Sequence, residues 1–264
     1  KDIQNIKSYK FDFIELDETD HVFTVTLNRP KKKNALHPQM INEIAFAFQY
    51  AFYNNNIRAV LLKSNGDVFC SGMDLKALAG DIEKNNSTIP EPNSKIFIGE
   101  LFNKLYKPKI CQLNGDVYAG GILLVAGCNY VISTKNIKLG LPEVKRGIFP
   151  MQVMESLSKI ISIRNVIDWC VRGYNLDVSI AKKWGLVSRV VKKEVLENET
   201  QKWLMEVTSN SPTAIRLGLE ALDKINSSEL NHLYLSEMLE KVLNSADAKE
   251  GINAFKNKRT PDWK

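Results

Sequence analysis

The chain has 264 residues, 44% of them hydrophobic and 25% charged, and these ordinary values exclude a disordered or collagen-like chain. Its longest apolar runs are far shorter than the roughly 20 residues that a helix needs to span a bilayer, so we expect a soluble protein. The formal net charge of +6 is spread along the chain without an RNP signature or a Cys/His finger spacing, so nucleic acid is not an expected partner.

The first elements in chain order are a hairpin, a helix and a strand. Residues 11–16 and 21–28 favour β structure, with DETD between them as the connection. Apolar residues spaced by three and four predict an amphipathic helix over 37–52, with Pro38 in its first turn. Residues 57–65 then predict a short buried strand that runs into the small-residue turn CSGMDLKAL.

The rest of the chain continues this pattern and then becomes helical. The polar segment 81–94 predicts a mobile loop, and residues 108–115 predict a second buried strand. A turn with two glycines and an apolar helix follow, and then two short extended pieces, NYVIS and IKLGLPEV. From Met151 onward the pattern is almost entirely helical, apart from GLVSRVV at 185–191. We therefore predict a mixed α/β core followed by helices, with no linker that would separate two independent domains.

The cysteines indicate the compartment. The four of them are far apart and include no CxxC pair: Cys70, Cys111, Cys128 and Cys170. This pattern argues against a zinc site and favours reduced, buried thiols in a cytosol-like compartment. The chain begins at Lys1 and not at Met, so the alternative to a cytoplasmic location is the mitochondrial matrix, after removal of a leader.

Two turns carry the first functional signal. CSGMD at 70–74 and AGG at 119–121 each follow a predicted strand and precede a predicted helix. Small residues let a ligand approach the backbone closely, and a helix N-terminus leaves N–H groups without acceptors. Two such turns together would bind an anion or a polarised carbonyl group. The alternative is that both are ordinary strand-to-helix connections without a ligand.

Seven motifs in order along the chain resemble the crotonase superfamily, the enoyl-CoA hydratase/isomerase family. They are LNRPKKKNAL, FCSGMDLKAL, QLNGDVYAGG, KLGLPEVKRGIFP, GLVSRVV, SPTAIRLG and SADAKEGINAFKNKRTPDW. The resemblance implies an α/β protein with the ClpP/crotonase-like fold, a β-rich spiral core in the N-terminal part and a helical C-terminal region. We place the core at 1–190 and the helical region, with an expected role in oligomerisation, at 191–264.

The resemblance also implies a substrate, an acyl thioester carried on coenzyme A. Family members use one backbone N–H from each of two turns to hold the thioester oxygen, and the matching positions here are Met73 and Gly120. Negative charge collects on this oxygen when a proton leaves the α-carbon, and preorganised donors stabilise that charge. Coenzyme A enters as part of the substrate, and no metal or prosthetic group is expected.

Contacts to coenzyme A are expected around the first turn. The resemblance places the nucleotide phosphates near the basic run RPKKKNAL, where Lys31 and Lys33 are the candidates, and near Lys76. Ser71 and Leu75 match positions that bind adenine through the backbone. The alternative reading of the basic run is a solvated turn without a ligand.

One acid of the family pattern is missing. Hydratases of the family use two glutamates, and the first falls on Leu123 here, a wall of the acyl pocket, while the second is Glu143. One carboxylate suffices to move a proton from C2 to C4 of a 3-enoyl thioester, so we expect double-bond isomerisation with Glu143 as base and then acid. Tyr118 is expected to contact the substrate from the pocket wall. Asp116 is a weaker candidate for a replacement acid, because a turn-forming role fits it better.

Two other functions stay open, as does the assembly. The chain is alternatively a hydratase with an unconventional second group, or a catalytically reduced scaffold that binds acyl-CoA or RNA. Family members form trimers, or hexamers of two trimers, so we expect a homotrimer or hexamer in which the segment 246–263, with Phe255 and Trp263, crosses to a neighbour. A monomer that folds this tail onto itself is the alternative.

Overall fold

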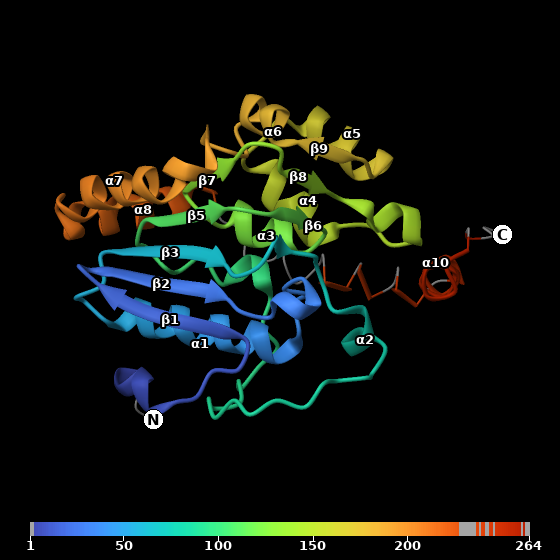
Figure 1. Ribbon diagram of the computed structural model, residues 1–264, viewed down its shortest axis with the longest axis horizontal. Coiled ribbons are helices and arrows are strands. Elements are labelled where there is room, and N and C mark those ends of the chain that lie inside the picture. The colour runs from blue at the N-terminus through green and yellow to red at the C-terminus, as the bar shows by residue number, and fades with distance from the viewer. Residues whose placement is uncertain are drawn as a thin grey trace.

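The fold is built around two β-sheets flanked by helices (Figure 1). The computed structural model describes residues 3–226, 236–237, 239–240, 243–244, 246–259 and 261. In this part of the chain the first sheet has six strands in the order β1-β2-β3-β5-β7-β10, and the second has four in the order β4-β6-β8-β9. The described residues contain no helix that is long and apolar enough to cross a bilayer.

The elements have the following bounds. The first sheet contains β1 (Ile14–Thr19), β2 (Val22–Leu27), β3 (Ala59–Ser64), β5 (Lys109–Leu113), β7 (Tyr130–Thr134) and β10 (Arg189–Val191). The second contains β4 (Val68–Cys70), β6 (Asp116–Tyr118), β8 (Lys138–Gly140) and β9 (Asn175–Asp177). The α-helices are α1 (Pro38–Tyr53), α2 (Leu75–Leu78), α3 (Gly121–Ala126), α4 (Met151–Ser158), α5 (Ile163–Arg172), α6 (Val178–Trp184), α7 (Leu196–Thr208), α8 (Pro212–Asn226) and α10 (Ala246–Lys256). The short 3-10 helices are η1 (Ile3–Ser8), η2 (Pro30–Lys32), η3 (Ile98–Glu100), η4 (Pro142–Arg146) and η5 (Lys193–Val195).

The chain alternates between the two sheets, and this gives the core its spiral path. β3, β5 and β7 are parallel neighbours in the first sheet. Each is followed along the chain by a strand of the second sheet, and these strands, β4, β6 and β8, are parallel neighbours too. Each circuit of the chain therefore adds one strand to both sheets. The architecture confirms the predicted crotonase fold, with helices dominating the C-terminal region.

The strand β3 in the first sheet is buried on both faces, which explains the apolar run in its sequence. Val60 and Leu62 of β3 face the large core that contains α1. Ala59 and Leu61 alternate with them and face a second core that contains Leu204 of α7. A strand covered on both faces reads as a continuous hydrophobic run and not as an alternating one. The run at 57–65 was therefore correctly predicted as a buried strand.

The N-terminal hairpin is present, but its connection is shorter than predicted. Thr19 pairs with Val22, so β1 includes three residues of DETD and only Asp20 and His21 form the turn. Both turn residues have left-handed backbones, with φ of 50° and 67°. Such two-residue turns match the twist of the strands that they join. The four-residue connection was wrong because Asp17, Glu18 and Thr19 pair with β2 and continue the strand, although their polar character is typical of a turn.

Short strands of the second sheet were also missed. β4 and β6 lie in segments interpreted as turns, and β9 lies in the region interpreted as helical. Each has only three residues, so neighbouring strands decide its conformation more than its own sequence does. The polar segment 81–94 contains no helix or strand, as predicted, although Thr88 donates a backbone hydrogen bond to Lys10 O (3.0 Å) and anchors its middle. The mobility of this segment stays a prediction.

A buried carboxylate links α1 to the start of the first sheet and provides a test of the fold. Glu43 is fully buried and accepts hydrogen bonds from the N–H groups of Asp12 (2.8 Å), Phe13 (2.9 Å) and Ile14 (3.1 Å). Glu43→Gln keeps the volume but turns an acceptor oxygen into a donor that faces these N–H groups. We expect the free energy of unfolding in urea to fall by about 1–3 kcal/mol. The exposed Glu100→Gln is the control, and equal stability of the two variants would contradict the expectation.

Candidate active site

Three parallel strands of the second sheet end side by side, and each is followed by one predicted site residue. Cys70 of β4 is in register with Val117 of β6, and Tyr118 of β6 is in register with Gly140 of β8. Just past β6, Ala119 N–H donates to Gly140 O at 2.8 Å. The carboxyl ends of parallel strands meet at one edge of a sheet. This edge therefore assembles the turns that carry the three predicted catalytic positions, namely Met73 after β4, Gly120 after β6 and Glu143 after β8.

The first two turns are in direct contact, and only glycine permits their approach. Gly72 has φ of +92°, and a Cβ atom there would lie 2.7 Å from Cβ of Ala119. A Cβ atom on Gly121 would lie 2.8 Å from Cβ of Cys70. On Gly120 it would lie 3.4 Å from Cγ of Met73, so the two predicted donor residues are neighbours. Gly72 and Gly121 are therefore required by packing of one turn on the other, whereas Gly120 leaves room for a methyl group.

The two predicted donors are unoccupied. Leu36 N–H donates to Gly72 O (2.8 Å), and Asp74 N–H donates to Leu36 O (3.1 Å), which ties the first turn to the end of the basic run. Within the part of the chain that the structure describes, the N–H groups of Met73 and Gly120 donate to no other residue. The two N–H groups are therefore available to a ligand oxygen, as the sequence predicts.

Glu143 provides the only acid that the family pattern predicts here. It lies in the first turn of η4, and its Oε2 atom is buried without a hydrogen-bond partner among the described residues. Burial raises the pKa of Glu143 to about 7, and the nearby charge of Arg146 only partly opposes the shift. Burial of the Cys170 thiol, and to a smaller extent the nearby charge of Glu143, raise the pKa of that thiol to about 12. A carboxyl group with a pKa near neutrality is suited to accept and return a proton.

Three further residues that the sequence singles out lie near these groups. Leu123 lies in α3 with only 5% of its surface exposed, so the position of the first family glutamate is apolar and buried. Asp116 accepts hydrogen bonds from the hydroxyl of Tyr118 (2.8 Å) and from Lys138 N–H (2.8 Å). Both of its carboxylate oxygens are therefore engaged, one within β6 and the other in joining β6 to β8. The ring of Tyr118 packs against Gly140, and burial raises the pKa of its hydroxyl to about 12.

The predicted coenzyme A contacts lie around the first turn. Lys31 and Lys33 are exposed, and Ser71 N–H donates to Lys33 O (3.0 Å), which brings the basic run against the turn. Leu75 begins α2 and is half-buried, and Lys76 follows it on the surface. The structure thus leaves the amines accessible to a polyanionic ligand next to the turn that carries Met73.

Arg29 was counted with the basic run, but the structure separates it from the lysines. Its side chain is 7% exposed and pairs with Asp74 (2.7 Å) and with Glu83. Arg29 is therefore an internal ion-pairing group, in contrast to the exposed lysines that follow it. The sequence offered one weak signal, which was an Arg directly after a strand and before Pro30.

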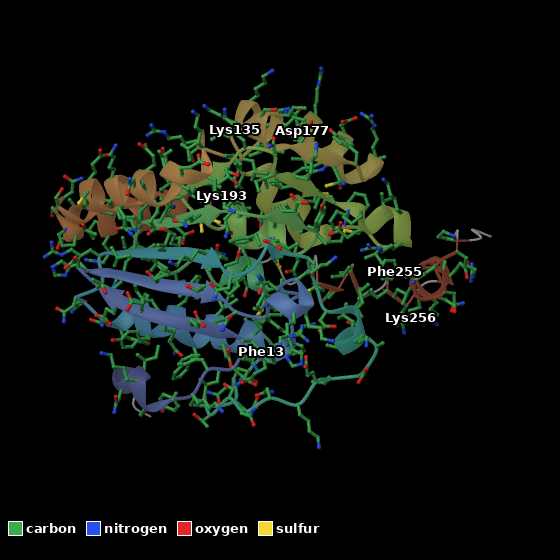
Figure 2. The ribbon with its side chains drawn as sticks, viewed as in Figure 1. Phe13, Lys135, Asp177, Lys193, Phe255 and Lys256 are labelled. Carbon is green, nitrogen blue, oxygen red and sulfur yellow. The ribbon has the colours of Figure 1, made fainter. Side chains whose placement is uncertain are left out.

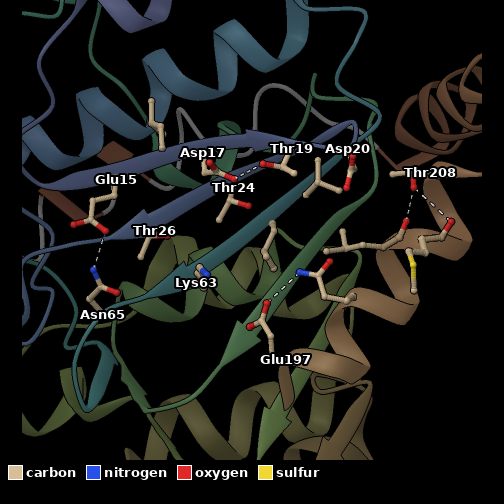
Figure 3. Close-up of a pocket in the computed structure, with 16 residues that line it drawn as sticks. Glu15, Asp17, Thr19, Asp20, Thr24, Thr26, Lys63, Asn65, Glu197 and Thr208 are labelled. Atoms are coloured by element: carbon tan, nitrogen blue, oxygen red, sulfur yellow. Dashed lines mark hydrogen bonds between the residues drawn. The ribbon is translucent and has the colours of Figure 1, made fainter. Parts of the chain in front are cut away.

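One cavity among the described residues lies elsewhere and does not suit coenzyme A. Figure 3 shows this space of about 570 Å³ between the β1-β2-β3 part of the first sheet and α7. No predicted site residue lines it. Four carboxylates do, those of Glu15, Asp17, Asp20 and Glu197. Their field would repel the phosphates of a coenzyme A thioester.

The described residues show no metal site. They hold no group of three or more His, Cys, Asp and Glu side chains that could bind an ion, and all four cysteines are free and buried. The predicted reduced thiols match the structure.

The C-terminal helix α10 covers η4 of its own chain. A Cβ atom on Gly251 would overlap the backbone of Arg146, so the two backbones touch. The Arg146 guanidinium lies 4.4 Å from the ring centre of Phe255, which is at the right of Figure 2. In this single chain, the C-terminal helix α10 therefore folds back onto its own chain. Trp263 lies outside the described residues, and the trimer or hexamer stays a prediction.

Comparison with known proteins identifies the family. Residues 17–264 match the enoyl-CoA hydratase/isomerase family. The chain is 31% identical over 251 residues to a putative enoyl-CoA hydratase of Thermus thermophilus, covering 92% of this chain and 98% of that one. It is 28% identical over 251 residues to the mevalonyl-coenzyme A hydratase sidH of Aspergillus fumigatus, with 93% and 92% covered. The crystal structure of a carnitinyl-CoA hydratase from Mycobacterium avium superposes with a TM-score of 0.84 at 25% identity, covering 97% of this chain and 99% of that one. With its fold and almost its whole length matched, this chain belongs to the enoyl-CoA hydratase/isomerase family of acyl-CoA enzymes.

Proposed function

We propose that the protein isomerises 3-enoyl-CoA thioesters to 2-enoyl-CoA thioesters. Glu143 removes a proton from C2, and the electron pair of that C–H bond moves onto the thioester oxygen as an enolate. When the enolate collapses, C2 and C3 become doubly bonded, the C3–C4 double bond breaks, and Glu143 returns its proton to C4. Atoms and charges balance without any other reactant.

The observation that carries this proposal is the pairing of one acid with two free donors. Glu143 has a pKa of about 7, and the position of the first family glutamate is the buried Leu123. The unoccupied N–H groups of Met73 and Gly120 supply the stabilisation of the enolate, at roughly 3–4 kcal/mol for each donor. One acid and one oxyanion site are all that a proton shift requires.

Coenzyme A would be held beside the first turn. Lys31, Lys33 and Lys76 are placed to contact its phosphates, and the backbone of Ser71 and Leu75 to contact its adenine. Exposed amines contribute as flexible point charges, so binding should weaken as the salt concentration rises. The acyl chain would extend along Leu123 and Tyr118.

Hydration is the main alternative, because the relatives above are named hydratases. Adding water needs one group to activate the water and another to handle the proton on the α-carbon. Leu123 offers neither group, and Asp116 has both oxygens engaged in hydrogen bonds. A scaffold that only binds acyl-CoA or RNA is the third candidate, favoured by the missing acid and the net charge of +6.

A panel of 2-enoyl and 3-enoyl thioesters, followed by absorbance, separates the three functions. We expect the wild type to convert 3-enoyl thioesters, and we expect Glu143→Gln to lose about a thousandfold in kcat/KM because it has no base. The matched control is Glu194→Gln, on the surface in η5. Hydration of a 2-enoyl thioester at normal rates would replace isomerisation with hydration, and thioester binding without any turnover would support the scaffold.

The raised pKa of Glu143 predicts the pH dependence. Only the carboxylate form removes a proton, so kcat/KM for isomerisation should rise tenfold per pH unit below the pKa and level off above about 7. Because burial raises the folded-state pKa, the folded chain holds this proton more tightly than the unfolded chain does. The wild type should therefore lose stability relative to Glu143→Gln as the pH rises through 7. Initial rates and urea unfolding across pH 5–9 measure both effects, and profiles that stay flat through neutrality would contradict this assignment.

Gly120→Ala separates the packing role of this glycine from its role toward the substrate. A Cβ atom here would have Met73 Cγ at 3.4 Å as its nearest neighbour, and the φ of −55° suits alanine, so we expect normal stability. Next to the bound thioester a methyl group should displace the carbonyl and lower kcat/KM by about ten- to a hundredfold. Gly218→Ala in α8, where the added methyl meets no atom within 4 Å, is the control. Undiminished activity of Gly120→Ala would place the thioester elsewhere.

A further inference from the structure

We propose that Arg29 is a positioning residue that orients and polarises the Met73 N–H group through a chain of hydrogen bonds. The inference rests on the proposed function, in which this N–H group holds the thioester oxygen. The chain, called the relay below, consists of the Arg29 guanidinium, the peptide group between Ala35 and Leu36, and the peptide group between Gly72 and Met73. Each link is a hydrogen bond of the structure.

The links run in one direction. Nη1 of Arg29 donates to Ala35 O at 3.2 Å. The same peptide group donates through Leu36 N–H to Gly72 O at 2.8 Å. Gly72 O in turn belongs to the peptide group that ends in the free N–H of Met73. Because every group accepts on one side and donates on the other, each bond strengthens the next.

The relay begins at a full positive charge that the fold holds in place. Arg29 is 7% exposed and lies 5.3 Å from the ring centre of Phe13. Its Nη1 atom also donates to Asp74 Oδ2 at 2.7 Å, and its Nη2 atom pairs with Glu83. These two acids leave the guanidinium one orientation, in which the second proton of Nη1 points at Ala35 O.

Asp74 also fixes the other side of the Met73 residue. Its Oδ1 atom accepts from the N–H groups of Lys76 (3.0 Å) and Ala77 (3.3 Å) and so caps α2. The Asp74 N–H group donates to Leu36 O at 3.1 Å. Arg29, through Asp74 and through Ala35, therefore holds the peptide groups on both sides of Met73. The peptide group of the other proposed donor, Gly120, receives no hydrogen bond from a charged side chain. Among the described residues its oxygen, Ala119 O, accepts only from Ile122 N–H.

The relay predicts that Arg29 acts on the transition state more than on substrate binding. In Arg29→Lys the charge stays but the planar fork that serves Ala35 and Asp74 together is lost. We expect kcat to fall about tenfold while KM changes less than about threefold, because the oxyanion forms only during the reaction. Arg29→Gln, a neutral donor, should lose more. Lys32→Met is the control, since this exposed lysine belongs to the same basic run but lies outside the relay.

A spectroscopic readout separates polarisation from a merely structural role. The ¹³C resonance of the thioester carbonyl in a bound, saturated [1-¹³C]acyl-CoA moves downfield when donors polarise it. We expect this shift to decrease in the order wild type, Arg29→Lys, Arg29→Gln, and to stay unchanged in Lys32→Met. Unchanged kcat and carbonyl shift in a folded Arg29→Lys would overturn the proposal.

A measurement without ligand keeps the relay testable by itself. The amide proton of Leu36 should move upfield in free Arg29→Lys, because its peptide loses the hydrogen bond from the guanidinium, while the amide of Asn129, which donates to Lys109 O, should not move.

If the wild type neither binds nor converts any thioester, the proposed function fails while a shifted Leu36 resonance still supports the relay. A Leu36 resonance that is the same in wild type and variant refutes the relay even if the enzyme is an active isomerase. Should the variants fail to fold, the Leu36 amide of the wild type must move downfield when the saturated acyl-CoA binds, and a resonance that stays in place overturns the proposal.

Discussion

Two backbone N–H groups without acceptors, those of Met73 and Gly120, are the constraint on which the site depends. Leaving a buried donor unpaired destabilises a fold, typically by about 1–3 kcal/mol. Here the donors stay free because their neighbours are occupied. Leu36 N–H donates to Gly72 O and Leu36 O accepts from Asp74 N–H, while Ala119 N–H donates to Gly140 O. In the proposed function, the backbone N–H group of Met73 and not its side chain contacts the thioester oxygen.

The surroundings of Arg29 and Glu143 affect the charges of these two side chains in opposite ways. Arg29 is buried with two carboxylates around it, so its charge is compensated and directed at a peptide oxygen. Glu143 is buried without a hydrogen-bond partner on Oε2, so its charged form is disfavoured and its basicity rises. In the proposed mechanism, Arg29 orients a donor and Glu143 moves the proton. The helix α10 packs over η4, which makes the surroundings of the acid depend on a segment about a hundred residues further along the chain.

Prediction from sequence worked where local signals were strong. The amphipathic period found α1, the apolar run found β5, and the ordered motifs found the family and the two glycine turns. It failed where three-residue strands depend on their neighbours, as β4, β6 and β9 do. It also failed at Arg29, which looks like the lysines beside it. A charge becomes internal only when distant acids, here Asp74 and Glu83, fold against it.

The amino-acid sequence by itself determined which groups are available: glycines that allow two turns to touch, one glutamate after a proline, and a leucine in place of the second acid. Only the tertiary structure decided what these groups do. Three strand ends meet at one sheet edge, and this brings together the turns that carry Met73, Gly120 and Glu143. Burial then set the pKa of the acid, and hydrogen bonds across separate segments set the direction of the donors. Both are properties of the surroundings of a residue, and those surroundings exist only in the folded chain.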